Sequence, residues 1–370
     1  MKFIISPFFL LKKISNISKV IIRKPIISSL ENFLFEIIDG SLTIVGSDLQ
    51  NFIISKFSIN SNENISVLVP AHILIDTLKI LPDKNIIFSI DKDKYIIEII
   101  SKNGNYKLLG KNSDEFPNIF IKRSLNTIKI PSLILKKIIY NTAIISNNDE
   151  LKLSVNGINI IMDKIGMTVI TTDGYRLVKY FRNDINFYIK KNFIISKRSF
   201  LLLNSLLSNI SNKIEVEFNN NNIYLKINNI IMVSKLVFEE YLDYQSIIPN
   251  KNLYNLNIYS NNLLMSLRRL LIYTNTKTRF IEFRIKKNSL SLVAENSNNN
   301  KAIEIIYCKY SGINININFN AKLFIELLGI ISSKEIKIFF SISNQACVVQ
   351  PGKKLKNESL LLLIMPIILT

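Results

Sequence analysis

The feature that most constrains this chain is an internal repeat with a long period. Three segments each read as a short strand, a polar residue and an amphipathic helix with a basic pair near its middle. The pairs are Lys12–Lys13, Lys136–Lys137 and Arg268–Arg269. Steps of 124 and 132 residues separate the successive pairs, far longer than the period of a solenoid repeat. The chain is therefore expected to contain three whole domains of one type.

Two further elements recur in the same order. A second helix is expected over Pro70–Leu81, Ser196–Leu207 and Asn320–Ile331. A strand that ends in a polar corner stops at Asp48, Asp173 and Asn296. The sequence thus predicts an α+β fold in which each domain packs two helices on antiparallel sheets. Polar stretches near residues 126 and 251 place the domains at residues 1–126, 127–251 and 252–370.

The charge of the chain favours a polyanionic partner such as nucleic acid. Basic residues exceed acidic ones by 47 to 28, which gives a formal charge of +19. Because lysine is abundant everywhere, only basic residues that recur at equivalent places are taken as evidence. This criterion selects Lys12, Lys13, Lys136, Lys137, Arg268 and Arg269 as contacts to DNA phosphates. No base-reading motif accompanies them, so contact independent of base sequence is expected.

No enzyme site emerges from the sequence. A single histidine, His72, and only 10 glycines argue against a His-ligated metal, a Ser-His-Asp enzyme and a Gly-rich dinucleotide fold. Gly104–Asn112 resembles a phosphate loop, but it is one residue too long and lacks the final Ser or Thr. Asp91 and Asp93 could form a metal-binding pair, but they lie between two alternating strands and indicate a hairpin turn. We expect no catalytic residue, no metal and no cofactor.

The ends and the cysteines bear on location. Cys308 and Cys347 lie far apart and match no metal-binding spacing, as is typical of a protein of the reducing cytoplasm. The apolar ends Met1–Leu11 and Leu360–Leu369 are each interrupted by a proline. Both are shorter than the ~20 residues that a membrane span needs. A cytoplasmic protein without a membrane segment is expected.

The segment Thr171–Leu177, TTDGYRL, resembles the T-D-G-x-R-L signature of the bacterial sliding clamp family, the DNA polymerase III beta subunits. Other segments are similar to that family in the same order along the whole chain: Met1–Phe3, Arg23–Pro25, Gly46–Leu49, Glu115–Asn118, Val155–Gly157, Val233–Leu236, Asp243–Pro249, Asn318–Ala321 and Met365–Pro366. Each motif is weak alone, and together they are specific.

The resemblance implies a head-to-tail homodimer of three-domain chains that closes a six-domain ring. Helices would line the hole around double-stranded DNA, and sheets would form the outside. The implied function is processivity, because the ring tethers the replicative polymerase near the primer end and is not itself catalytic. The clamp loader and other proteins with a clamp-binding motif are the further partners implied.

The resemblance also implies roles for particular residues. Arg23 and Lys24 fall where the family's loop touches DNA, and Lys197 and Arg198 are similar candidates on a helix. The subunit interface would join Tyr106 and Leu108 of one chain to Ile272 and Tyr273 of the other. A peptide-binding cleft between the second and third domains would comprise Val155, Thr172, Gly174, Tyr175, Arg176, Leu177, Leu242, Ile247, Leu363, Met365, Pro366, Ile367 and Leu369.

The chain departs from the family pattern around this cleft. Leu242 stands where proline is common, and Ser246 and Ile368 stand where arginine is frequent. Acidic residues common in the third-domain interface are partly replaced by Asn298–Asn300. The cleft is therefore expected to be more apolar and less charged than usual.

Three other interpretations predict different behaviour. A DNA-binding protein without a ring would bind linear and circular DNA alike. A nucleic-acid enzyme that uses Asp91 and Asp93 would lose a metal-dependent activity when both are changed to Asn. A peripheral membrane protein would float with liposomes. The threefold repeat and the segment Thr172–Leu177 favour the ring.

Overall fold

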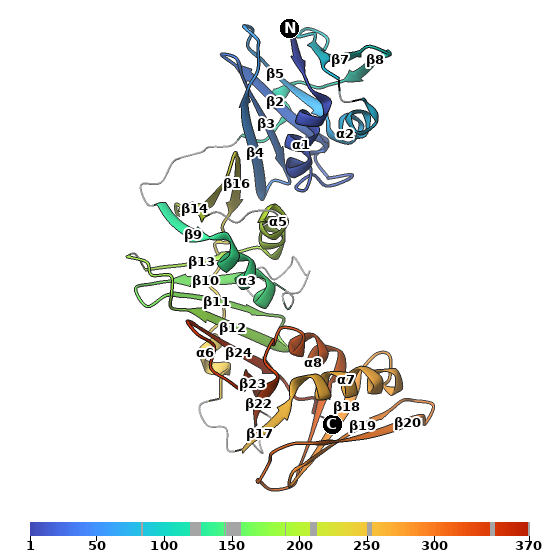
Figure 1. Cartoon of the computed structure of the whole chain (residues 1–370), viewed down its shortest axis with the longest axis vertical. Coiled ribbons are helices and arrows are strands. Elements are labelled where there is room, and N and C mark those ends of the chain that lie inside the picture. Colours follow the sequence, from blue (N-terminus) through green and yellow to red (C-terminus); the bar gives the residue numbers. More distant parts are fainter. Residues whose placement is uncertain are drawn as a thin grey trace. The chain divides into compact units, whose positions relative to one another are not determined.

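The computed structural model describes residues 1–82, 84–118, 127–143, 145, 157–188, 190–207, 213–249, 254–340 and 345–368. One series of elements occurs three times along the chain: a strand, a helix, four strands, a second helix and three strands (Figure 1). The three α+β repeats predicted from the sequence are therefore confirmed. Their predicted limits at residues 126 and 251 lie outside the described residues and stay a prediction.

The bounds of the elements follow the three series. The first contains β1 Lys2–Ile5, α1 Pro7–Ile17, η1 Ser28–Glu31, β2 Asn32–Ile38, β3 Ser41–Ser47, β4 Asn51–Ser58, β5 Ile65–Pro70, α2 Ala71–Ile80, β6 Ile86–Ile90, β7 Ile96–Ser101 and β8 Gly104–Leu109, then η2 Ser113–Glu115. The second contains β9 Thr127–Pro131, α3 Ser132–Thr142, β10 Ile158–Met162, β11 Met167–Thr172, β12 Arg176–Arg182, β13 Lys191–Ile195, α5 Lys197–Leu207, β14 Lys213–Phe218, β15 Asn222–Ile227 and β16 Ile230–Lys235, then α6 Tyr244–Ile247. The third contains β17 Tyr254–Tyr259, α7 Ser260–Leu270, η4 Leu271–Tyr273, β18 Phe280–Lys286, β19 Ser289–Glu295, β20 Lys301–Tyr307, β21 Ile315–Asn320, α8 Ala321–Leu328, β22 Glu335–Phe340, β23 Cys347–Pro351 and β24 Glu358–Ile364.

The first helix shows why these segments fold as they do. The Ser6 side chain caps α1 by accepting a hydrogen bond from the Phe9 N–H, and Pro7 occupies the first turn, where its missing N–H costs nothing. Leu10, Ile14 and others at helical spacing are buried. The amphipathic stripe predicted from the sequence is the face that packs on α2, β3 and β4.

The strands form two four-stranded and two eight-stranded antiparallel sheets. The four-stranded sheets have the orders β1-β6-β7-β8 and β20-β19-β18-β21. The eight-stranded sheets have the orders β5-β2-β3-β4-β16-β15-β14-β9 and β13-β10-β11-β12-β24-β23-β22-β17. Each eight-stranded sheet thus combines four strands from one series with four from the next.

Two strand pairs join the series. In the first junction β4 pairs with β16, with Phe52 opposite Val233, and in the second junction β12 pairs with β24, with Leu177 opposite Leu363. The chain divides into two compact units, Met1–Leu135 with Leu201–Leu236, and Lys136–Phe200 with Val237–Thr370. Each unit contains one eight-stranded sheet, so the division between the units runs through the second series.

Local predictions from the sequence are confirmed in detail. The three predicted second helices are α2, α5 and α8. Asp91 and Asp93 lie in the turn between β6 and β7, where Asp91 Oδ1 accepts a 3.0 Å hydrogen bond from the Asp93 N–H. Gly104–Asn112 contributes β8, an edge strand. Among the described residues, no helix is long and apolar enough to cross a membrane.

Candidate functional site

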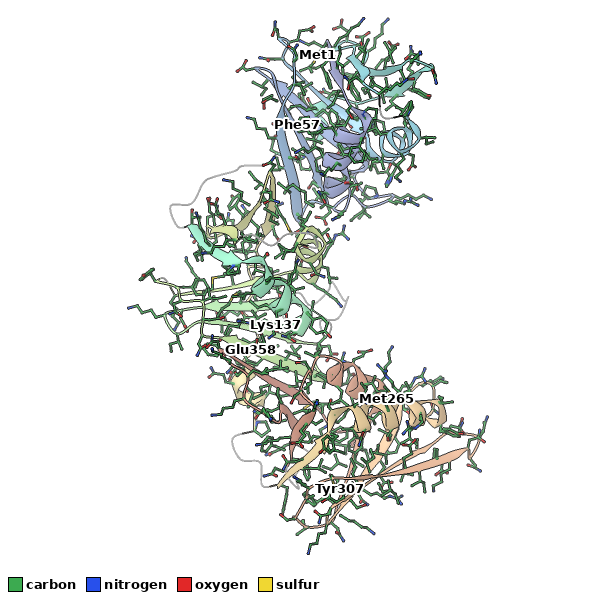
Figure 2. The ribbon with its side chains drawn as sticks, in the orientation of Figure 1. Met1, Phe57, Lys137, Met265, Tyr307 and Glu358 are labelled. Carbon is green, nitrogen blue, oxygen red and sulfur yellow. The ribbon has the colours of Figure 1, made fainter. Side chains whose placement is uncertain are left out.

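The second residue of each basic pair lies against strands. Lys13 Nζ lies 5.2 Å from the ring centre of Phe9 and 5.8 Å from that of Phe57 on β4. Lys137 Nζ lies 2.5 Å from Glu358 Oε1, and the two side chains meet between α3 and β24 (Figure 2). A cation–π contact therefore holds the first of these lysines, and a carboxylate holds the other.

The third pair follows the same division. Arg269 donates two hydrogen bonds of 2.7 Å to the carboxylate oxygens of Glu304 on β20, and this bond raises the pKa of its guanidinium. Lys12 and Arg268 are exposed, and Lys136 is half-buried. No ion pair includes Lys12 or Arg268 in the described part of the chain. Lys12 and Arg268 are therefore the ones best placed to meet a phosphate without breaking an ion pair.

The other predicted DNA contacts occupy two different settings. Arg23 and Lys24 are exposed in the segment after α1, where Lys24 has a φ of 54° and its backbone N–H donates to Glu31 Oε1 over 2.7 Å. Lys197 and Arg198 begin α5 and are half-buried. Burial, with the nearby Arg176 charge, lowers the pKa of the Lys197 ammonium.

A buried carboxylate connects α3, β12 and β24. Glu358 accepts hydrogen bonds from Lys137, from the Tyr180 hydroxyl and, at 2.9 Å, from Arg182, its cross-strand neighbour. Arg182 also binds both oxygens of Asp184, which lowers the pKa of that carboxyl and raises the pKa of the guanidinium. Burial raises the pKa of the Tyr180 phenol, so it stays a donor. The sequence offered no signal for this cluster beyond a glutamate at the start of an apolar strand.

The segment Thr172–Leu177 forms a tight, fully bonded turn. Asp173 Oδ1 accepts hydrogen bonds from the N–H groups of Tyr175 and Arg176, over 3.0 and 2.8 Å. Thr172 Oγ1 accepts from the Gly174 N–H and donates to the Arg176 carbonyl. Gly174 has a φ of 86°, in the left-handed region that glycine adopts without strain. This segment is therefore a turn motif in which the Thr172 and Asp173 side chains both bind the backbone.

Arg176 fastens this turn to α8. Its side chain is 5% exposed and binds the Asp173 carboxylate through Nε and one terminal nitrogen. Its other terminal nitrogen donates to the Leu323 carbonyl over 3.1 Å and to Glu326 Oε2 over 2.8 Å. The guanidinium is thus neutralised within the protein, and its role at the site is to position the turn.

An apolar cluster lies beside the turn, around Leu177 and Leu363. Its buried members are Ile170, Leu177, Ala346, Val348 and Leu363, and the half-buried side chains packed on it include Tyr241, Tyr244 and Ile248. Burial raises the pKa of the Tyr241 phenol, which donates a hydrogen bond to the Ile170 carbonyl. Lys179 Nζ lies 5.6 Å from the ring centre of Tyr244.

Exposed apolar side chains border this cluster. Tyr175 is 67% exposed, Ile247 40% and Met365 38%, and the Met365 N–H donates to the Tyr175 carbonyl over 2.9 Å. Thr172, Leu177 and Leu363 of the predicted cleft are buried, whereas Gly174 is exposed and Leu242, Pro366 and Ile367 are half-buried. Val155 and Leu369 lie outside the described residues. Among the described residues of the predicted cleft, those of the segment Thr172–Leu177 therefore lie beside Leu363 and Met365 at one end of the β12–β24 pair.

The predicted subunit-interface residues differ in exposure. Tyr106, on the edge strand β8, is 40% exposed, and Ile272 and Tyr273, in η4, are 79% and 41% exposed. Leu108 is only 6% exposed because it faces the core of its own sheet, and its neighbour Leu109 is 70% exposed. The exposed apolar surface at this edge thus includes a residue that the sequence did not single out.

Comparison with known proteins gives one consistent result. Three models of the DNA polymerase III beta subunit match the chain: the N-terminal domain over residues 1–120, the central domain over 129–243 and the C-terminal domain over 245–368. The beta sliding clamp of Buchnera aphidicola subsp. Acyrthosiphon pisum is 28% identical, covering 95% of this chain and 96% of that protein. The beta sliding clamp of Haemophilus influenzae is 24% identical, with the same coverage of both chains.

Solved structures agree on the fold. The DNA polymerase III subunit beta from Pseudomonas aeruginosa superposes with a TM-score of 0.93 at 22% identity, covering 100% of both chains. The beta subunit from Thermotoga maritima gives a TM-score of 0.89 at 24% identity over the whole of both chains. A P. aeruginosa sliding clamp solved with bound griselimycin gives 0.90.

Proposed function

The chain belongs to the DNA polymerase III beta subunit family, and from that premise we propose that it works as a sliding clamp on DNA. Its curated relatives are beta sliding clamps, so its function is to confer processivity on a DNA polymerase rather than to catalyse a reaction. The tether raises the local concentration of polymerase at the primer end.

The pattern of strand pairing is the observation that carries the proposal of a ring. In both junctions within the chain, the fourth strand of one series pairs with the last strand of the next, as β4 with β16 and β12 with β24. The same positions are held by β20 and β8, which are sheet edges without a partner in the described chain. Pairing β20 of one copy with β8 of a second copy completes the pattern twice, and a closed head-to-tail dimer results. We call this pairing the closing junction.

The surroundings of these edges support the same dimer. The exposed Ile272 and Tyr273 follow α7 in the series that contains β20, and the exposed Tyr106 lies on β8. The register of the second junction places Arg182 opposite Glu358, and the equivalent positions of the closing junction are Ile306 and Lys102 of the second copy. Lys102 would then lie near Glu304, the carboxylate that Arg269 already binds.

Duplex DNA in the hole would meet the first helices and the loop after α1. Lys12, Arg23, Lys24 and Arg268 are exposed cations there and would make sequence-independent phosphate contacts. Lys13, Lys137 and Arg269 already have aromatic or carboxylate partners and would contribute less.

The apolar surface beside Thr172–Leu177 would bind partner proteins. Tyr175, Ile247 and Met365 offer exposed apolar contacts around a buried cluster, as an extended peptide with aliphatic or aromatic anchors requires. Polymerase, clamp loader and other clamp-binding proteins would compete for this surface in the cytoplasm. Because Arg176 is neutralised by two carboxylates, apolar anchors would supply most of the affinity.

A topological experiment tests the ring. The protein is loaded onto nicked circular DNA with a bacterial clamp loader and ATP, the complex is isolated at moderate salt, and the circle is then cut once. We expect the protein to be lost from the linear DNA and kept on the uncut circle. Equal retention on both would instead show surface binding without a ring.

A further inference from the structure

The two junctions within the chain fix the register of the closing junction. The turns before β4, β12 and β20 align these three strands. Each turn closes by a backbone hydrogen bond, in which the N–H of Asp48, Asp173 or Asn296 donates to the carbonyl of Asn51, Arg176 or Asn300. The residues that follow these turns, Phe52, Leu177 and Lys301, therefore hold one position of the pattern.

The strands on the other side of the junctions, β8, β16 and β24, are aligned by the residues that follow them. Lys111 forms a bridge with Leu68, Val237 forms one with Ile194, and the Ile367 N–H donates to the Asn318 carbonyl. Four residues before these positions stand Lys107, Val233 and Leu363.

The residues that face each other at this position are apolar in the two junctions within the chain and basic in the closing junction. Phe52 lies opposite Val233 and Leu177 lies opposite Leu363, and all four side chains are buried in apolar clusters. In the proposed dimer, the same register would place Lys301 of one copy opposite Lys107 of the other. Both lysines are exposed in the single chain, as residues on an unpaired edge would be.

The carboxylates beside these lysines do not remove the repulsion between them. Lys301 forms a 3.2 Å ion pair with Glu295, and Lys107 lies opposite Glu98 in its own sheet. Across the closing junction the row therefore reads Glu295, Lys301, Lys107, Glu98, with the two like charges in the middle. Like charges directly opposite on neighbouring strands destabilise a sheet, and their separation is shorter than the screening length at physiological salt.

We infer that a pair of facing lysines, Lys301 and Lys107, weakens each closing junction of the ring. This inference rests on the proposed dimer. Two such pairs occur in each ring, one at each closing junction, so their effects on dissociation combine. A charge reversal at one lysine converts repulsion into attraction at both junctions at once.

The test is a charge-swap cycle in the full-length protein, read by sedimentation velocity over a dilution series. We expect Lys301→Glu and Lys107→Glu each to lower the dimer dissociation constant by about tenfold, since two cross-strand pairs change sign. The double variant restores like charges, now both negative, and should lose this gain. Lys286→Glu, the same charge change on exposed Lys286 of β18 in the same sheet, should leave the constant within about twofold.

The outcomes separate the inference from the function it rests on. The inference about the facing lysines would be wrong, and the proposed dimer unaffected, in either of two cases. The single variants would dimerise no more tightly than Lys286→Glu, or the double variant would dimerise as tightly as the single ones. A chain that stays monomeric at every concentration and in every variant would overturn the ring itself.

Discussion

The turn Ser47–Phe52 of the first series and the turn Thr172–Leu177 of the second share one backbone structure. Asp48 Oδ1 accepts from the N–H groups of Gln50 and Asn51, as Asp173 does from the two equivalent groups of its turn. Ser47 Oγ donates to the Asn51 carbonyl, as Thr172 donates to that of Arg176. The turn that carries the family signature is thus a property of the fold, which the chain makes at more than one junction.

The two turns differ in what covers the apolar cluster beside them. The cluster beside the first turn includes Phe52, Val233 and Phe116, which is 5% exposed and comes from the segment after β8. The cluster beside the second turn is bordered by Tyr175, Ile247 and Met365, each more than a third exposed. A closed cluster holds the chain together, whereas an open one of the same origin can bind another protein.

The largest expected effect comes from opening the closed cluster. Phe116→Ala should lower the free energy of unfolding by about 3 kcal/mol, because it leaves a cavity among buried side chains. Urea denaturation measures this loss. Ile247→Ala, on the border of the second cluster and 40% exposed, should cost less than half as much, and Phe8→Ala, 64% exposed on α1, should cost almost nothing. Equal losses for all three would mean that the first cluster is no more closed than the second.

The next largest loss of stability is expected from a change that removes the hydrogen bonds between the second turn and α8. Arg176→Asn copies Asn51 of the first turn, whose side chain binds Asp48, but it gives up the bonds to Glu326 and Leu323. We expect a loss of about 2 kcal/mol, as for buried hydrogen bonds to charged groups. Peptide binding, followed by fluorescence anisotropy with a labelled polymerase peptide, should weaken at the same time.

Arg284→Asn is the control for this change, since it removes an exposed ion pair with Glu282. If it destabilised the chain as much as Arg176→Asn, the link to α8 would have no special role.

A smaller change in stability is expected when the residues with positive φ in the two turns are exchanged. Leu49 has a φ of 73° in the first turn, where the second turn has Gly174 at 86°. Gly174→Leu should cost about 1 kcal/mol through backbone strain alone, because no atom lies within 4 Å of the added Cβ. Leu49→Gly should relieve the corresponding strain, and thermal unfolding should show opposite shifts. Shifts of the same sign would show that the two backbones are not equivalent.

The smallest effect is a dependence on acid beside the second junction. Because Arg182 holds the pKa of Asp184 below its ordinary 3.8, the folded chain binds this proton less readily than the unfolded chain. The resulting stability is complete above that ordinary value and is lost as the pH falls through the lowered pKa. Asp184→Asn should flatten this part of a pH–stability profile. Lys13→Met, beside the first junction, removes a cation that lies on Phe57 and no carboxyl, so it should leave the slope unchanged.

The sequence predicted the parts of the site that depend on local order. The period of the repeat located the helices, and the segment Thr171–Leu177 located the turn, because the hydrogen bonds that close the turn join residues two to four positions apart. Apolar alternation likewise predicted the strands on either side of Asp91 and Asp93.

The partners of charged residues could not be predicted in this way. Glu326 lies 150 residues from Arg176, and Glu358 lies 221 residues from Lys137. Helical spacing shows that Lys137 is on a surface, but it does not show which strand that surface meets. The same reason hid the burial of Leu108, since its face of β8 depends on a register that only the folded sheet defines.

The eight-stranded sheets also bear on how the chain gains its structure. Each eight-stranded sheet takes half its strands from one repeat and half from the next. The boundaries of the sequence repeats therefore differ from the boundaries of the hydrogen-bonded sheets. A fragment cut at the limits of one repeat would leave β4, β12, β16 or β24 as an unpaired sheet edge. Amides of the second repeat should accordingly exchange with solvent in two groups, β9 and β14–β16 with the first repeat, and β10–β13 with the third.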